Sequence, residues 1–248
     1  MTDLSGKVAL VTGGSRGLGR EMVLAFAEHG ADVVIASRKL DACAALADEV
    51  RAKHGSRALA LACNVGDWAQ CDQLVESAYA EFGRVDILVN NAGMSPLYPS
   101  VDAVTEGLYD KVFGVNLKGP FRLMAAIGTW MAAGAGGSII NITSVGAVRP
   151  EPGIVPYAAA KAGLNAMTEG FARAFGPTVR VNAIQCGMFR TDISKAWPPE
   201  MLDVVVKERT ALGRVGEPAE VVGAALYLAS EASSYCTGAI LRLDGGTR

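Results

Sequence analysis

The sequence predicts an α/β protein in which helices cover both faces of a parallel β-sheet. Short apolar runs alternate with stretches in which apolar residues recur at helical spacing, and this alternation continues along the whole chain. Such units make parallel strands, because each helix returns the chain to the same edge of the sheet. Half of the 248 residues are apolar and 19% are charged, which suits a sheet buried on both faces. Neither a linker-like stretch nor an internal repeat divides the chain, so we expect one domain over residues 1–248.

The first half of the chain should hold four strands and the helices between them. Gly30 is a suitable stop for the first helix, Asp67 is a suitable N-cap for the third, and Gly83 is a suitable stop for it. The apolar runs are rich in Val, Ile and Leu, as expected of buried strands. The expected strands cover residues 7–12, 32–36, 57–63 and 86–89, and the helices between them lie at about 18–29, 40–53 and 68–82.

The second half should continue the pattern with three more strands. Pro156 stands where a first helical residue is favoured, and the alanine run after it favours a helix. Another helix should begin at Glu217-Pro218. The remaining elements are expected to be helices at about 102–114 and 118–133 and strands at 137–142, 179–184 and 239–243.

Composition argues against several classes of function. The net charge is -2 without a long run of either sign, so we expect neither a nucleic-acid partner nor a membrane-surface partner. The five cysteines are odd in number and lack a C-x-x-C spacing, so neither disulfides nor a metal site are expected. The first residues lack a secretory apolar core, and apolar runs are shorter than the roughly 18 residues that span a membrane. We therefore expect a cytoplasmic protein.

A glycine-rich turn follows the first expected strand and precedes a helix. Glycines allow close approach to a pyrophosphate, and a helix N-terminus offers free N–H groups to it. The spacing Gly13-x-x-x-Gly17-x-Gly19 differs from the common dinucleotide fingerprint, and glycines alone could simply make a tight turn. The strand before and the helix after favour dinucleotide binding. The expected cofactor contacts are Gly13, Ser15, Arg16, Gly17, Leu18 and Gly19.

The residues after the second strand indicate which dinucleotide binds. An acidic residue there would bond a free ribose 2′-hydroxyl, whereas a cation would accommodate a 2′-phosphate. The sequence reads Ser37-Arg38-Lys39 and has no acid at this point. NADP(H) is therefore favoured and NAD(H) remains possible. The alternative is a solvated Arg38-Lys39 pair at the start of a helix.

Ser144, Tyr157 and Lys161 form a candidate proton-donating site. Tyr157 and Lys161 are four residues apart and share a helix face, and Ser144 ends a strand. A cation within about 4 to 6 Å lowers the pKa of a tyrosine by about 1 to 3 units, toward the neutral range where an acid/base works best. On spacing alone, a Tyr-x-x-x-Lys pair on a helix surface without a catalytic role is the more common explanation.

Taken together, the ordered motifs resemble the short-chain dehydrogenase/reductase family. They are Thr12-Gly13-x-x-x-Gly17-x-Gly19, Asn90-Asn91-Ala92-Gly93, Asn116, Ser144, Tyr157-x-x-x-Lys161 and Asp244-Gly245-Gly246. The resemblance covers essentially the whole chain. It implies a Rossmann-type doubly wound sheet of about seven strands, usually in a homotetramer. It also implies hydride transfer between a nicotinamide and a carbonyl or secondary alcohol, the chemistry of oxidoreductases that act on CH–OH groups, and similarity to 3-oxoacyl-[acyl-carrier-protein] reductases.

The resemblance also implies a role for individual residues. Tyr157 would be the acid/base, Ser144 would bind the substrate oxygen, and Asn116 would support a water-linked proton path. Lys161 would hold the ribose and tune Tyr157. The further cofactor contacts would be Asn64, Val65, Asn91, Ala92, Gly93, Gly187 and Thr191, with Thr191 at the nicotinamide carboxamide.

Two positions depart from the family pattern. Asn64-Val65 stands where the family usually has Asp-Val, but the Asn oxygen can still accept a bond from the adenine amino group. Cys186-Gly187 stands where Pro-Gly is usual. Cys186 is therefore either a thiol beside the cofactor or, as the more common case, a small buried residue.

The substrate is a small carbonyl or alcohol compound that the sequence does not identify. Residues 187–210 should cover the substrate, and the apolar residues there favour an apolar ketone or a 3-oxoacyl thioester. The alternatives are an NAD-preferring alcohol or sugar dehydrogenase of the same family, and a protein that senses a dinucleotide without catalysis. Surplus apolar residues on the 118–133 helix and near Phe171 and Phe175 indicate subunit contacts.

Overall fold

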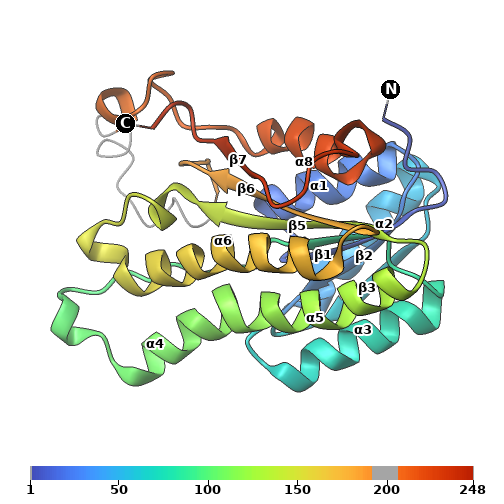
Figure 1. Cartoon of the computed structure of the whole chain (residues 1–248), viewed down its shortest axis with the longest axis horizontal. Coiled ribbons are helices and arrows are strands. Elements are labelled where there is room, and N and C mark those ends of the chain that lie inside the picture. The colour runs from blue at the N-terminus through green and yellow to red at the C-terminus, as the bar shows by residue number, and fades with distance from the viewer. Residues whose placement is uncertain (1, 192–205, 248) are drawn as a thin grey trace.

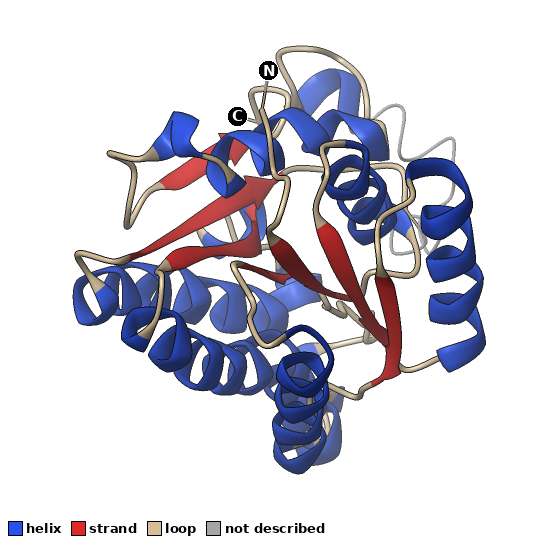
Figure 2. Ribbon diagram, turned by 90° about the vertical axis from the view of Figure 1, so that its right-hand side faces the viewer, coloured by secondary structure: helices blue, strands red, loops and turns tan. Residues whose placement is uncertain are grey.

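The computed structural model describes residues 2–191 and 206–247 and confirms the predicted fold class. Seven parallel strands form one sheet in the order β3-β2-β1-β4-β5-β6-β7. Figure 1 shows helices on both sides of this sheet, and Figure 2 shows the same arrangement from the side. The strands are β1 (Val8–Thr12), β2 (Asp32–Ser37), β3 (Ala58–Ala62), β4 (Ile87–Asn90), β5 (Gly137–Ser144), β6 (Val179–Cys186) and β7 (Ile240–Leu243).

The helices divide between the two faces of the sheet. One face packs against α1 (Gly17–Glu28), α2 (Leu40–His54) and α8 (Val222–Ala229), and the other packs against α3 (Trp68–Phe82), α5 (Gly119–Ala133) and α6 (Val155–Phe175). A further helix, α4 (Glu106–Phe113), runs through a short π-helical turn, η2 (Gly114–Lys118), into α5. None of the described helices is both long enough and apolar enough to cross a membrane.

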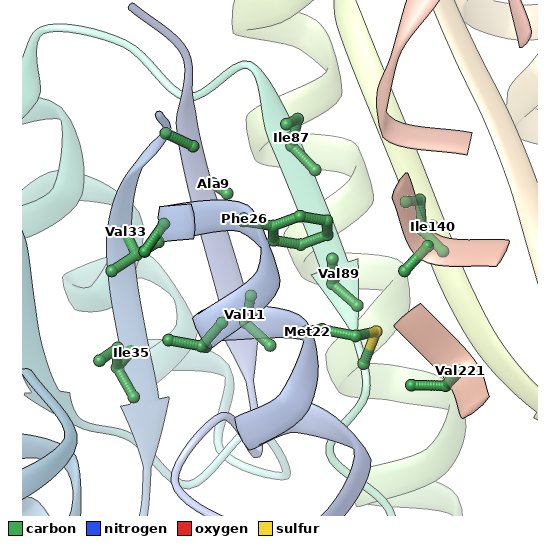
Figure 3. Packing of buried hydrophobic residues seen from close by; sticks show 14 of the residues in the cluster. Ala9, Val11, Met22, Phe26, Val33, Ile35, Ile87, Val89, Ile140 and Val221 are labelled. Atoms are coloured by element: carbon green, nitrogen blue, oxygen red, sulfur yellow. The ribbon is translucent and has the colours of Figure 1, made fainter. Parts of the chain in front are cut away.

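The core explains why the sequence alternates as it does. Successive residues of a strand point to opposite faces, so Ala9 and Val11 of β1 face α1, while Val8 and Leu10 face the other helix layer. Figure 3 shows the fully buried Phe26 ring of α1 lying over these strands. Because both faces are covered, the central strands must be apolar throughout rather than alternating.

The observed boundaries differ from the predicted ones at the ends of β5 and β6 and at the start of α4. β5 and β6 each run two residues further than predicted, because their backbone pairing continues to the Ser144–Cys186 pair. The helix predicted to begin at 102 begins instead at Glu106, because the Thr105 hydroxyl accepts the N–H of Leu108 as an N-cap. The expected caps of α3 are confirmed: the Asp67 side chain accepts the N–H of Gln70, and Gly83 ends the helix.

The strand order reverses between β1 and β4. From β1 the sheet grows to one side through β2 and β3, and the chain then returns to add β4 on the other side of β1. Ligands of open α/β sheets bind outside the carboxyl ends of the strands at such a reversal. The glycine-rich turn and the Asn90-Asn91-Ala92-Gly93 segment begin at these two strand ends.

Candidate active site

The glycine-rich turn is closely packed. Gly13 has a left-handed φ of +62°, and a side chain there would place its Cβ 2.9 Å from the Cα of Ala92. A Cβ on Gly19 would lie 2.3 Å from the Gly13 carbonyl oxygen. Gly17 has a φ of +53°, and Arg16 is the N-cap residue of α1, with an extended backbone. Glycine is therefore required at these positions, and within the described residues no side-chain bond caps the N-terminus of α1 that follows the turn.

Thr12 and Asn91 join the turn to the end of β4. The Thr12 hydroxyl accepts the N–H groups of Asn91 (3.1 Å) and Ala92 (3.2 Å) and donates to the Val89 carbonyl. The amide of Asn91 donates to the carbonyls of Thr12 and Gly13. Asn91 is thus engaged in holding the turn. Sequence reasoning gave Thr12 no role of its own, and its place directly before the first glycine was the one signal for it.

The end of β2 lies beside the same turn. Ser15 donates a hydrogen bond to the Ser37 hydroxyl at 3.0 Å, which fixes the β2 end against the turn. Arg38 and Lys39 follow on the exposed surface, and neither side chain has a hydrogen-bond or ion-pair partner among the described residues. The side chain of Leu18 packs against the hydrophobic core between α1 and the sheet, and it thereby stabilises the turn.

The other expected cofactor contacts lie at the same edge of the sheet, and each has different neighbours. The side-chain oxygen of Asn64 accepts the N–H of Gly66 at 3.2 Å, and Val65 is buried next to it. Gly187 follows β6 and packs so tightly on Asp244 that a Cβ would lie 2.6 Å from the Asp244 Cα. A Cβ on Gly17 would lie 3.6 Å from Cγ2 of Thr191, so Thr191 lies over the glycine-rich turn.

Ser144 and Tyr157 meet at the end of β5. The Ser144 hydroxyl accepts the N–H of Gly146 at 3.1 Å and lies close enough to the Tyr157 phenol to act on its pKa. Gly146 lies against both side chains: a Cβ there would be 3.4 Å from Ser144 Oγ and 3.9 Å from the Tyr157 ring. The strand end and the start of α6 therefore place a hydroxyl and a phenol at one point.

Lys161 and Asn116 lie behind this pair. Lys161 is buried, its Nζ lies 5.8 Å from the centre of the Tyr157 ring, and it donates to the Ile142 carbonyl at 2.8 Å. The amide of Asn116 donates to the carbonyls of Met94 and Val112. A Cβ on Gly93 would lie 3.1 Å from Asn116 Oδ1 and 3.7 Å from Lys161 Nζ, so these groups flank the same glycine.

Burial controls the ionisation of the site. It raises the pKa of Tyr157 to about 12, although the Ser144 hydrogen bond acts in the opposite direction. Burial also lowers the pKa of Lys161 to about 8. We expected Lys161 to lower the pKa of Tyr157 toward neutral pH. This expectation is wrong, because burial destabilises the phenolate and raises the pKa instead. Tyr157 is therefore a protonated donor at neutral pH.

Cys186 is a buried neighbour of the site. It is the cross-strand partner of Ser144, and its side chain is 6% exposed. Burial raises the pKa of the Cys186 thiol to about 12, with the Lys161 charge acting in the opposite direction. A buried and protonated thiol is a poor nucleophile, which supports the interpretation of Cys186 as a small packing residue.

An apolar hollow opens beside Tyr157. It is lined by Pro96, Tyr98, Leu108, Val112, Ile154, Pro156 and Tyr157. Of the expected substrate-covering segment 187–210, residues 192–205 lie outside the described residues. Its flanks pack inward: Phe189 is buried against Gly216, and Met188 contacts Val206 and Val215. Within the described part of the chain, no group of three or more His, Cys, Asp or Glu side chains is arranged to hold a metal.

The fold and the site together define a class of nucleotide-binding oxidoreductase. Residues 13–248 match the family model described as enoyl-(acyl carrier protein) reductase. The chain is 37% identical over 247 residues to 3-oxoacyl-[acyl-carrier-protein] reductase FabG of Thermotoga maritima, covering 98% of each chain. It is 38% identical over 250 residues to L-rhamnose 1-dehydrogenase (NAD(P)(+)) of Azotobacter vinelandii, covering 97% of this chain and 96% of that one.

A solved structure is similar over the same length. The 3-oxoacyl (acyl-carrier-protein) reductase of Agrobacterium tumefaciens C58 with NADP bound superposes with a TM-score of 0.93 at 34% identity, covering 99% of this chain and 95% of that chain. The protein belongs to the short-chain dehydrogenase/reductase family, and it is an oxidoreductase.

Proposed function

We propose that the protein is an NADP(H)-dependent oxidoreductase that interconverts a small carbonyl compound and its secondary alcohol. The observation that carries the proposal is that Ser144 and Tyr157 meet around Gly146, beside the buried Lys161, at the sheet edge where the glycine-rich turn lies. A bound nicotinamide dinucleotide supplies or accepts the hydride. The chain's own groups must then bind the substrate oxygen and move one proton.

Tyr157 is the proposed acid/base, and Ser144 orients the substrate. In carbonyl reduction, the phenol donates its proton to the developing alkoxide, and the Ser144 hydroxyl donates a hydrogen bond to the same oxygen. Lys161 holds the cofactor ribose and keeps a positive charge near the phenolate that remains. Asn116 is the proposed support for the water-linked path that returns the proton.

The glycine-rich turn is the proposed cofactor cradle. A Cβ on Gly13 or Gly19 would clash with backbone atoms of Ala92 and Gly13, so the turn can form only with glycine at these positions. The turn leads into the N-terminus of α1, which is the proposed site for the pyrophosphate. Ser15, Arg16, Gly17 and Leu18 complete this side, and Asn64, Val65, Asn91, Ala92 and Gly93 complete the adenosine side. Gly187 and Thr191 are the proposed contacts on the nicotinamide side.

The preference for NADP(H) rests on Arg38 and Lys39. Both are exposed next to Ser37, and neither side chain has a protein partner among the described residues, which suits cations that bind a 2′-phosphate. NAD(H) remains the second cofactor, because the relative named for NAD(P)(+) has a similar sequence.

The proposed substrate is an apolar ketone or a 3-oxoacyl thioester. Almost all the side chains around the hollow beside Tyr157 are apolar, which favours such a substrate over a small sugar, and the hollow itself has room for about one water molecule. The alternatives are an NAD-preferring alcohol or sugar dehydrogenase of the same family, and a dinucleotide sensor without catalysis. The Ser144–Tyr157 pair favours catalysis, because a sensor needs only the cofactor turn.

A turnover panel tests this proposal. Loss of NADPH absorbance should be measured with 3-oxoacyl thioesters, cyclic ketones, steroids and sugars, and repeated with NADH. We expect turnover with apolar carbonyls and a higher kcat/KM with NADPH than with NADH. Tight NADPH binding without turnover of any of these compounds would support the sensor instead, and better turnover of sugars with NADH would support the other alternative.

We further propose a single-domain, cytoplasmic enzyme that assembles as a homotetramer. All five cysteines are free, as expected in a reducing compartment. The side chains of Trp68, Phe121 and Trp130 on α3 and α5 are between 41% and 51% exposed, and Phe121 contacts Phe171 of α6. Aromatic surface of this kind is typical of an interface between subunits. Sedimentation equilibrium should give four chain masses, and a monomer would contradict the proposal.

A further inference from the structure

Tyr98 bridges two segments that are distant in the sequence. Its hydroxyl donates to the Pro152 carbonyl at 2.6 Å and accepts the N–H of Val155 at 2.8 Å. Tyr98 lies in the loop after β4, whereas Pro152 begins the 3₁₀ turn η4 (Pro152–Ile154) and Val155 begins α6. One hydroxyl group therefore fastens both ends of the turn that leads into α6.

The first turn of α6 needs this bond. The first N–H groups of a helix have no partner within the helix, and a side chain at the N-cap usually accepts one of them. The N-cap residue here is Ile154, whose side chain has no acceptor, and Pro156 has no N–H to offer. The Tyr98 hydroxyl thus supplies from another loop the acceptor that the local sequence lacks.

The same turn determines where the Tyr157 phenol lies. Tyr157 is two residues after Val155, and Tyr98, Ile154 and Tyr157 line one hollow. A Cβ on Gly146 would contact Cδ1 of Ile154 at 3.0 Å as well as Ser144 and Tyr157, so the turn and the hydroxyl pair pack around one point. A shift of the turn would therefore change the alignment of Tyr157 with Ser144.

We propose that Tyr98 is a positioning residue, whose hydroxyl holds the first turn of α6 and thereby aligns the Tyr157 phenol with the substrate oxygen. The proposal rests on the proposed function, because it assigns Tyr98 to the reaction of Tyr157. Tyr98 takes no part in the proton transfer itself. Its bonds act on alignment, to which rates are very sensitive.

The Tyr98→Phe variant removes both hydrogen bonds and keeps the ring. We expect kcat with the best carbonyl of the panel to fall about tenfold, since both lost hydrogen bonds act on the alignment of Tyr157. The KM for NADPH should stay within about twofold, because the glycine-rich turn is untouched. Tyr235→Phe is the matched control, because Tyr235 is fully exposed and has no hydrogen bond in the described part of the structure.

Amide hydrogen exchange, followed by mass spectrometry, gives a readout that does not depend on turnover. Peptides covering residues 152–158 should exchange faster in Tyr98→Phe than in Tyr235→Phe, while peptides from β1 and α1 stay unchanged. Unchanged exchange at 152–158 would overturn the helix anchor. Faster exchange with unchanged kcat would reduce Tyr98 to a structural contact and overturn the positioning role.

The two proposals fail in different ways. An active wild-type enzyme with an inactive Tyr157→Phe variant and a normal Tyr98→Phe variant would overturn only the role of Tyr98. A wild-type protein without turnover on the panel would overturn the proposed function and the positioning role with it. The exchange experiment would then still report whether Tyr98 anchors α6.

Discussion

The Nζ atom of Lys161 lies 5.8 Å from the centre of the Tyr157 ring and donates a hydrogen bond to the Ile142 carbonyl. The ammonium is buried in the protein interior, where a charged group is costly, and burial lowers its pKa to about 8. The arrangement keeps a positive charge beside the phenol at the expense of stability. Active sites often contain groups that are needed for activity and that lower the stability of the fold.

Replacement of Lys161 should therefore stabilise the protein while abolishing turnover. The folded pKa of about 8 lies below the ordinary 10.5, so the unfolded chain binds more protons and wild-type stability rises with pH between these values. Lys161→Met should be more stable than wild type by about 1 to 3 kcal/mol at pH 7, less whatever the lost Ile142 hydrogen bond contributes. Urea denaturation checks this, with the exposed Lys111→Met as the control. A less stable Lys161→Met at pH 7, or a gap that widens toward pH 10, would contradict it.

The pH dependence of turnover should differ between the two directions. Reduction needs the protonated phenol, which the raised pKa of about 12 preserves, so kcat/KM for reduction should be nearly level from about pH 6 to 8. Alcohol oxidation needs the phenolate, whose fraction increases about tenfold per pH unit below the pKa. Its log kcat/KM should therefore rise with a slope near one. Initial rates in both directions measure this, and a level profile for oxidation would argue against Tyr157 as the base.

Gly13→Ala should disrupt the cofactor turn. The added Cβ would lie 2.9 Å from the Ala92 Cα and 2.9 Å from the side-chain nitrogen Nδ2 of Asn91. Gly13 also has a left-handed φ of +62°. We expect loss of NADPH binding and destabilisation of about 1 to 3 kcal/mol. Gly107→Ala is the matched control, because it lies in α4 with open space at its Cβ, and it should be neutral or stabilising by about 0.5 to 1 kcal/mol. Fluorescence titration and thermal unfolding check both, and normal NADPH affinity in Gly13→Ala would contradict the cradle.

Arg38→Ala should change the choice of cofactor. Loss of one charge-assisted bond to a 2′-phosphate should raise the KM for NADPH about ten- to a hundredfold and leave the KM for NADH within about twofold. Lys111→Ala removes a positive charge from the exposed surface of α4 and should change neither value. Equal effects of Arg38→Ala on the two cofactors would indicate that Arg38 is a solvated surface residue.

The sequence predicted the sheet well because its signals are local. Each buried strand is an apolar run, and caps such as Asp67 and Gly83 are visible within a few residues of the helix they end. The limits of β5 and β6 were less predictable, because pairing between the strands, rather than the polarity of Ser144, decides where they stop. Thr105 likewise shifted the start of α4 through a side-chain cap.

The sequence predicted that the motif residues gather at one edge of the sheet, but it did not predict how burial changes the pKa values of Tyr157 and Lys161. The motif residues gather at the carboxyl edge of the sheet, because Ser144 ends a parallel strand and Gly13 and Asn91 each follow one. Burial of Tyr157 and Lys161 depends on the whole fold, so the direction of their pKa shifts could not be derived from spacing. The bond from Tyr98 to Val155 spans 57 residues and leaves no local pattern in the sequence.

Tyr157→Phe tests the central claim most directly. The variant keeps the ring and removes the one hydroxyl that is proposed to move the proton, and Tyr235→Phe serves as the control for loss of a phenol elsewhere. NADPH affinity by fluorescence titration and kcat with the best carbonyl should be measured on the same preparations. We predict nearly normal NADPH binding with a fall in kcat of about 100- to 10,000-fold. Turnover close to that of the wild type would contradict the assignment of Tyr157 as the proton donor.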